Sequence, residues 1–271
     1  MKSRSQLLLG SLCVILVAFP SLVFSKGVLV SGQRSEAELL KEIHHKRDDE
    51  LALKKLLPIV VSPFKPSVHE QILLTQLRDA KTNTQDFRLA ADKIAELLVS
   101  KVIDCLATHE IVLASPVDKF EGKVLADKPE LLSIMRSGDA LLPVFMKHFP
   151  EASVSKILVQ RHEETAKPHF QYMKLSPQLQ SGHTVIITEP MIATGGSLAM
   201  VISRIIEKGV KQENILIASI CVAPEGALSL QTKFPKLRLV LIALDEKLNE
   251  KKYIVPGLGD FGDRYFGTEG I

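Results

Sequence analysis

The chain has 271 residues, 46% of them hydrophobic, and is long enough for one large α/β domain or two small ones. Its net charge of +3 is too small to argue for a nucleic-acid partner, and its low aromatic content of 5% leaves few side chains on which bases could stack. The cysteines, Cys13, Cys105 and Cys221, are too far apart for a metal knuckle. Because Cys13 lies inside the N-terminal apolar run, they form no disulfide framework either, and we expect buried, inert thiols.

Residues 1–25 form an apolar segment that we expect to be a signal peptide or a membrane anchor, with membrane contact through residues 5–25. Lys2 and Arg4 precede an uncharged run that is rich in Leu and Val and has no polar face, which is unlike a core helix. The alternative is an upstream start codon that the working protein does not use. The rest of the chain is expected in the cytoplasm or an organelle.

Residues 26–57 read as a charged helical extension. Ser35, followed by Glu36 and Glu38, is suited to a helix start. The apolar residues give only a partial stripe, so we predict a solvated spacer; they are Leu39, Leu40, Ile43, Leu51 and Leu53. The main domain is expected to span residues 58–271.

The stretch 69–106 predicts two helices, separated by a turn at residues 81–84, with Thr84 as the N-cap of the second. These helices are expected to cover a sheet and to help the protein dimerise. No chemistry is visible in them.

An apolar strand, residues 131–135, then ends at Arg136 beside Gly138, and a helix follows. An arginine at the carboxyl end of a strand can grip a pyrophosphate with two hydrogen bonds, although an ordinary surface arginine is the alternative. A further strand, residues 156–160, leads into the charged stretch from Arg161 to Thr165.

Residues 183–210 are the central stretch of the chain. A β-branched strand at 184–188 precedes Glu189 and a small-residue loop at 193–197, and apolar residues at helical spacing follow up to Gly209. Such a strand, turn and helix can cradle a phosphate on backbone N–H groups, whereas the alternative is a plain connection. Glu189 favours the cradle, because an acid at this point can hold sugar hydroxyls beside the phosphate.

Two further buried strands, residues 214–222 and 237–244, alternate with a helix that begins near residue 224. Strands that alternate with helices imply a parallel sheet covered on both faces, with ligands at the carboxyl ends of the strands. Arg136, Arg161 and Glu189 all fall at such ends.

The C-terminal stretch, residues 253–269, reads YIVPGLGDFGDRYFGTE. Residues 257–262 spell a dinucleotide-binding fingerprint, but that motif needs a helix and a long βαβ unit after it, and only nine residues remain. A dinucleotide site is therefore rejected. Nucleotide-kinase chemistry is rejected as well, because the loop at 194–197 has no P-loop lysine.

Two motifs carry a family resemblance. TEPMIATGGS at 188–197 resembles the phosphoribosyl pyrophosphate (PRPP) motif of type I phosphoribosyltransferases, and residues 253–269 are similar almost residue for residue to the uracil-binding end of uracil phosphoribosyltransferases. The LRD triplet at 77–79 resembles the family's opening segment. Three residues depart from the family pattern, namely Glu189, where Asp is usual, and Gln160 and Gln171, which replace aromatic residues.

The resemblance, over residues 58–271, implies a type I phosphoribosyltransferase fold: a central parallel sheet with helices on both faces, a small hood and a mobile hairpin. It implies pyrimidine salvage, in which uracil and PRPP give UMP and diphosphate. Mg²⁺ is implied as cofactor, held through PRPP without direct protein ligands. A homodimer or homotetramer and a GTP effector are also implied.

By the same resemblance Glu189 holds the ribose hydroxyls, Arg136 and Arg161 hold the pyrophosphate, and Arg161 and Asp260 are the catalytic residues. The remaining PRPP-binding residues would be Pro190, Met191, Ile192, Ala193, Thr194, Gly195, Gly196 and Ser197, together with Asp260. Uracil would be read by Ile254, Gly259, Asp260 and Phe261, mainly through backbone groups. The alternatives are a membrane-tethered, catalytically weak regulatory homologue that binds PRPP or a nucleotide, and a transferase for another base.

Overall fold

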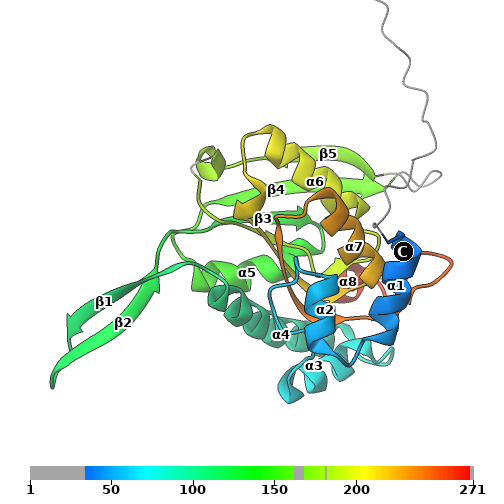
Figure 1. The fold of residues 1–271 in the computed structure, drawn as a ribbon, viewed down its shortest axis with the longest axis horizontal. Helices are drawn as coiled ribbons and strands as arrows, with labels where there is room; N and C mark the ends of the chain where they lie inside the picture. The colour runs from blue at the N-terminus through cyan, green and yellow to red at the C-terminus, as the bar shows by residue number, and fades with distance from the viewer. Residues whose placement is uncertain (1–33, 162–167, 181, 269–271) are drawn as a thin grey trace, which may run out of the picture. The chain divides into compact units, whose positions relative to one another are not determined.

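The computed structural model describes residues 34–161, 168–180 and 182–268 (Figure 1). The chain divides into residues 1–34 and a compact unit of residues 35–271, and the fold below is that of the second unit. The apolar segment expected at residues 1–25 lies outside the described residues. In the part that is described, no helix is both long and apolar enough to span a membrane.

A seven-stranded sheet forms the centre of the fold, with strand order β5-β4-β3-β6-β8-β7 and β9 paired to β8. All neighbouring pairs are parallel except β4 and β5, which form an antiparallel hairpin. The strands are β3 (Glu130–Met135), β4 (Val154–Arg161), β5 (Pro168–Lys174), β6 (Val185–Thr188), β7 (Met191–Ile192), β8 (Ile215–Val222) and β9 (Arg238–Leu244). The expected parallel sheet is therefore confirmed.

Helices cover both faces of the sheet, which explains why its strands are continuous apolar runs. Successive side chains alternate between two cores: Leu132 and Ile187 pack on one face, and Leu131 and Ile186 on the other. The first face carries α1 (Glu36–His45), α2 (Glu50–Leu56), α6 (Gly196–Glu207) and α7 (Pro224–Lys233). The second carries α3 (Val68–Arg78), α4 (Thr84–Asp104), α5 (Gly138–His148) and α8 (Phe261–Phe266).

The extension before residue 58 is not the solvated spacer that the sequence suggested. Its two helices begin at side-chain caps, Ser35 and Asp49, but Ile43, Leu53 and Leu56 are buried in the core that α6 and α7 share with the sheet. The break between α1 and α2 explains the error. Each helix has its own short apolar stripe, and the break turns both stripes toward the same core although they do not form one continuous helical pattern in the sequence.

Two details of the second core also differ from expectation. The N-cap of α4 is Asn83, whose side chain accepts a hydrogen bond from the backbone of Asp86, and not Thr84. A hairpin of β1 (Thr108–Ala114) and β2 (Lys119–Leu125), which the sequence analysis did not assign, forms a separate two-stranded sheet and projects from the unit (Figure 1).

The end of the chain is built from short elements. β10 (Lys247–Leu248) and β11 (Ile254–Val255) pair as a small antiparallel ribbon, and α8 follows. Two 3₁₀ turns, at Pro177–Gln180 and Gln212–Asn214, connect other elements. Of the expected thiols, Cys221 is buried and Cys105 is half-buried, and burial raises the pKa of both.

Candidate active site

The small-residue loop after β6 ends at a helix N-terminus. Gly195 is the N-cap of α6, with φ of 73°, and no side chain caps the helix there. The left-handed conformation suits glycine. The first N–H groups of a helix lack partners within the helix, and in α6 that of Gly196 donates a long hydrogen bond, at 3.4 Å, to Thr194 Oγ1. The N–H groups that follow it suit an anion, and the helix dipole favours the same ligand.

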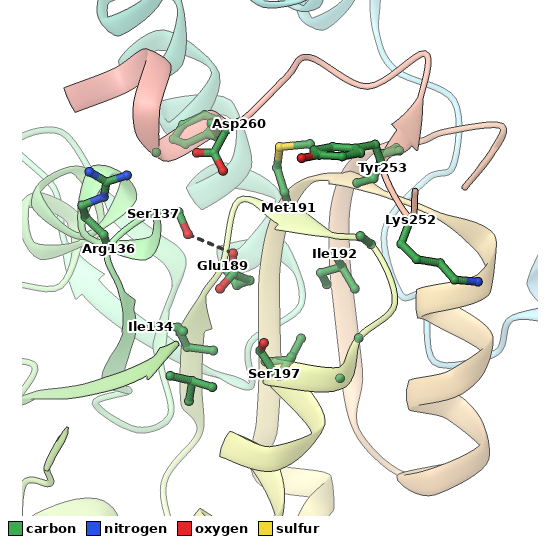
Figure 2. Close-up of a pocket in the computed structure, with 18 of the residues that line it drawn as sticks. Ile134, Arg136, Ser137, Glu189, Met191, Ile192, Ser197, Lys252, Tyr253 and Asp260 are labelled. Atoms are coloured by element: carbon green, nitrogen blue, oxygen red, sulfur yellow. Dashed lines mark hydrogen bonds between the residues drawn. The ribbon is translucent and has the colours of Figure 1, made fainter. Parts of the chain in front are cut away.

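Glu189 follows β6 directly and faces the start of α5. Its Oε1 atom accepts a hydrogen bond from Ser137 Oγ at 3.1 Å (Figure 2). The two segments approach closely at Gly138, where a Cβ would lie 2.3 Å from the carbonyl oxygen of Thr188. The end of β6 and the start of α5 are thus fixed to each other, and Glu189 keeps a defined place at the sheet edge.

Arg136, at the end of β3, reaches across to α8. Its guanidinium donates to Thr268 Oγ1 at 2.9 Å and forms an ion pair with Asp263, while the Phe266 ring lies 5.8 Å from its central carbon. Hydrogen bonds from Thr268 and from Arg136 lower the pKa of Asp263 below its ordinary value. Half of the Arg136 side chain stays exposed, so the remaining N–H groups can still meet a ligand.

The predicted base-binding segment runs from Ile254 into the first turn of α8. Asp260 is the N-cap of α8 and accepts a hydrogen bond from the backbone of Asp263 at 2.9 Å. The ring of Phe261 is buried against Phe87, at a centroid distance of 5.4 Å. The ring of Phe261 is therefore occupied in the core, and only its backbone is left to face the cleft.

A buried ion pair holds this segment, and the sequence analysis did not find it. Arg78 Nη1 and Nη2 donate to Asp245 at 2.8 and 2.5 Å, and the same carboxylate accepts the N–H of Gly257 at 2.9 Å. Burial lowers the pKa of Arg78, but the hydrogen bond to Asp245 and the charges of nearby acidic groups together raise it, so the net shift is upward. The partners are 167 positions apart. The only sequence feature that pointed to Arg78 was the LRD triplet at 77–79, and nothing in it indicated a partner for the arginine.

The small-residue loop, Glu189, Arg136 and the predicted base-binding segment line one cleft of about 520 Å³ at the carboxyl edge of the sheet (Figure 2). It gathers most of the predicted site residues, namely Arg136, Glu189, Met191, Ile192, Ala193, Gly195, Gly196, Ser197, Ile254, Gly259, Asp260 and Phe261.

Three predicted residues stand apart. Pro190 is buried, and its carbonyl accepts hydrogen bonds from the backbone of β8. Thr194 lines a neighbouring cavity of about 380 Å³ beside α1 and α7. Arg161 ends β4, and its side chain lies outside what the structure describes.

Sequence reasoning missed four cleft residues with polar side chains. Ser137 occupies the N-cap position of α5 without a side-chain capping hydrogen bond, and Lys251, Lys252 and Tyr253 stand directly before the base-binding segment. Tyr253 is 60% exposed and lies at the rim. The signal that could have found the lysines is their position, since two adjacent cations precede a glycine-rich stretch.

The cleft therefore combines cations and a helix N-terminus with two carboxylates, Glu189 and Asp260. Cations and backbone N–H groups suit a phosphorylated ligand, and the carboxylates suit sugar hydroxyls. The described part of the chain contains no group of three or more His, Cys, Asp or Glu side chains placed to hold a metal ion.

A parallel sheet with these groups at its carboxyl edge defines an α/β protein that binds a phosphorylated ligand. The family model for uracil phosphoribosyltransferase matches residues 66–268. The chain belongs to the uracil phosphoribosyltransferase family.

Individual relatives agree with this assignment. A uracil phosphoribosyltransferase of Dictyostelium discoideum is 39% identical over 201 residues, covering 73% of this chain and 91% of its own length. One of Bacillus licheniformis is 38% identical over 197 residues, covering 72% and 93%. Among solved structures, the AQ2163 protein from Aquifex aeolicus is similar, with a TM-score of 0.68 and 27% identity over 78% of this chain and all (100%) of its own.

Proposed function

We propose that the protein catalyses the transfer of the phosphoribosyl group of PRPP to uracil, giving UMP and diphosphate in pyrimidine salvage. One observation carries the proposal: the phosphate loop, Glu189, Arg136 and the base-binding segment line a single cleft. Family membership supports the same activity. In this reaction N1 of uracil forms a bond to C1 of the ribose and loses its proton, while the bond from C1 to the diphosphate oxygen breaks.

The residues of the cleft divide the work between the two substrates. The first N–H groups of α6 and the loop at 193–197 hold the 5′-phosphate, and Glu189, oriented by Ser137, accepts hydrogen bonds from the ribose hydroxyls. Arg136 and Arg161 stabilise the charge that develops on the leaving diphosphate. The backbone from Ile254 to Phe261 holds uracil in line with the ribose carbon, so the main contribution is placement.

We propose Mg²⁺ as the cofactor, held mainly through the diphosphate. The described cleft offers two carboxylates, Glu189 and Asp260, which fits an ion that keeps several ligands from substrate and water. When bound, the ion neutralises diphosphate charge. Asp260 faces PRPP or a water on the ion.

We further propose that residues 58–271 form the catalytic domain and that two copies associate through the β1–β2 hairpin. The hairpin exposes apolar side chains, with Val117 at 95%, Val112 at 66% and Phe120 at 55%. A patch of this kind on a soluble domain is characteristic of a protein contact. A homodimer, or a homotetramer built from two dimers, would cover it. Activation by GTP stays a prediction, which rate measurements with and without GTP test.

The test is UMP formation from labelled uracil, PRPP and Mg²⁺ by the full chain. We expect turnover that Arg161→Ala or Asp260→Ala abolishes. The matched control is Arg204→Ala, because this arginine pairs with Glu207 on α6 and does not line the cleft. If PRPP binds but neither uracil nor any other base gives a nucleotide, the proposal fails, and the membrane-tethered regulatory homologue becomes the better explanation.

A further inference from the structure

The extension formed by α1 and α2 lies before the residues that the family model matches, which begin at 66. It is nevertheless fixed to the domain. Ile43 is 1% exposed and Leu53 is 2% exposed, and both pack in the core beneath α7. A hydrogen bond from Gln231 of α7 to the carbonyl of Leu56, at 3.1 Å, ties the end of α2 as well. α1 lies beside α7 (Figure 1).

From this fixed position the extension contacts the end of β9 through two side chains. Arg47 NH2 donates to the carbonyl of Leu244 at 2.9 Å, and His44 Nε2 lies 2.7 Å from the carbonyl of Glu246. A carbonyl oxygen only accepts, so Nε2 of His44 carries the hydrogen. The two carbonyls flank Asp245. The extension therefore holds the backbone on both sides of that residue.

Asp245 in turn determines where the base-binding segment lies. It is 2% exposed, and its carboxylate accepts the N–H of Gly257 at 2.9 Å. Arg78, paired with the same carboxylate, donates to the carbonyl of Gly257 at 2.8 Å. The neighbouring residue adds a direct link, because the N–H of Glu246 donates to the carbonyl of Val255 at 2.8 Å.

The turn that these bonds hold has little freedom of its own. Gly257 has φ of 62°, and a Cβ there would lie 2.2 Å from the carbonyl of Ile254, so the turn is tight. A tight turn moves together with the residues that hold it, here Asp245 and Glu246. A displacement of residues 244–246 would thus be passed to the groups that are proposed to read uracil.

We propose that His44 and Arg47 are positioning residues for the base site, and that the extension acts as a strap across residues 244–246. The proposal rests on the function proposed above for residues 254–261. Both side chains are exposed, so their hydrogen bonds add little to the stability of the whole domain. Their effect should fall on the base rather than on PRPP, because both hydrogen bonds end on residues 244–246, which hold Gly257 and Val255, and neither involves the loop at 193–197.

The experiment uses the full chain with His44→Ala, Arg47→Ala and the double variant. We expect the KM for uracil to rise roughly fivefold for each single variant, with kcat and the KM for PRPP nearly unchanged. His44→Gln and Arg47→Lys keep a donor near the same carbonyl and are expected to restore much of the lost affinity. His45→Ala and Lys46→Ala are the matched controls, because the side chains of these neighbours are exposed and make no hydrogen bond with the described residues.

Hydrogen exchange of residues 244–258 gives a second readout that does not need turnover. We expect faster exchange at the Gly257 amide in the alanine variants and an unchanged rate in the controls. Active variants with an unchanged KM for uracil and unchanged exchange would overturn the strap. So would equal effects on both substrates, or equal effects in the controls. If the wild-type chain has no turnover but the alanine variants still exchange faster at Gly257 than the wild type, the proposed function is refuted and the positioning role of the extension stands.

Discussion

The contact between α7 and the phosphate loop allows a sharp test of that loop's role. Gly226, in the first turn of α7, lies directly under the loop, and a Cβ at this position would be 2.3 Å from the carbonyl oxygen of Ala193. It would also lie 3.0 Å from a methyl group of Ile192. The nearest atom belongs to the backbone and cannot rotate away. In Gly226→Ala the loop must therefore move by roughly 1 Å to reach an ordinary contact distance.

The effect on stability should be modest, because two contributions oppose each other. Alanine favours the helix by roughly 0.5–1 kcal/mol relative to glycine. Overpacking at the contact costs about 1–3 kcal/mol. A net loss of about 1–2 kcal/mol lowers Tm by roughly 3–6 °C in a domain of this size. The variant should therefore fold.

The effect on activity should be large and confined to one substrate. A shift of about 1 Å in a group that positions a reactant can lower the rate by about 100-fold. We expect kcat/KM for PRPP to fall by that order in steady-state assays, and the affinity for diphosphate and uracil to change far less.

The control is Gly122→Ala in β2, where the added methyl meets the flexible ring of Phe120 at 2.9 Å and a side-chain carbon of Ile111 at 3.9 Å, and no backbone atom lies nearer than these. It should leave kcat/KM for PRPP unaltered. If Gly226→Ala folds and keeps the PRPP kinetics of the parent, the loop at 193–197 does not hold the phosphate and the assignment is wrong.

Three further outcomes are expected. Asp263→Asn removes the counter-charge of Arg136 and should lower kcat/KM for PRPP roughly tenfold, and steady-state rates that match the parent would contradict this. Burial raises the pKa of Glu130 in the folded state, although Ser176 and His183 oppose the effect. The protonated side chain therefore contributes its full share to the free energy of unfolding below pH 4.5, the ordinary pKa, and this share is lost as pH rises through the folded-state pKa. Glu130→Gln, which mimics that form, should raise Tm at pH 7 and make little difference at pH 4. The double variant Val117→Asp with Phe120→Asp should be monomeric in sedimentation experiments, because both exposed side chains lie on the proposed contact between copies. An unchanged oligomer mass would exclude the β1–β2 hairpin as that contact.

The strands of the sheet could be predicted because helices bury both of their faces. β6 and β8 are therefore continuous apolar runs in the sequence. The β1–β2 hairpin lacks that signal, since its side chains on both faces are largely exposed. The extension was misjudged for a related reason. Its stripe is divided between two short helices, so neither shows enough apolar residues to indicate burial.

The candidate site divides in the same way. The loop at 193–197 and Glu189 follow a buried strand, so local sequence was enough to place them together at the sheet edge. The partners of the base-binding segment are remote in the sequence: Asp245 meets Arg78, and the side chain of Arg264 reaches the carbonyl of Asp79. Side-chain pairs of this kind leave no periodic pattern in a single sequence, and the fold has to bring them together first.

The two halves of the cleft should therefore respond differently to change. The phosphate half is built from backbone at the edge of the core sheet, and it can shift only if a buried element such as α7 shifts with it. The base half is a short ribbon and one six-residue helix, α8, held by ion pairs and arginine–carbonyl bonds to α3, β9 and the extension. The exposed hydrogen bonds of His44 and Arg47 can be altered singly without opening the core. Arg78 and Gly257, in contrast, share the buried carboxylate of Asp245 and should respond together. Substitutions at the exposed bonds of the base half should thus alter affinity for uracil in graded steps, whereas Gly226→Ala, beneath the phosphate loop, should lower kcat/KM for PRPP by about 100-fold.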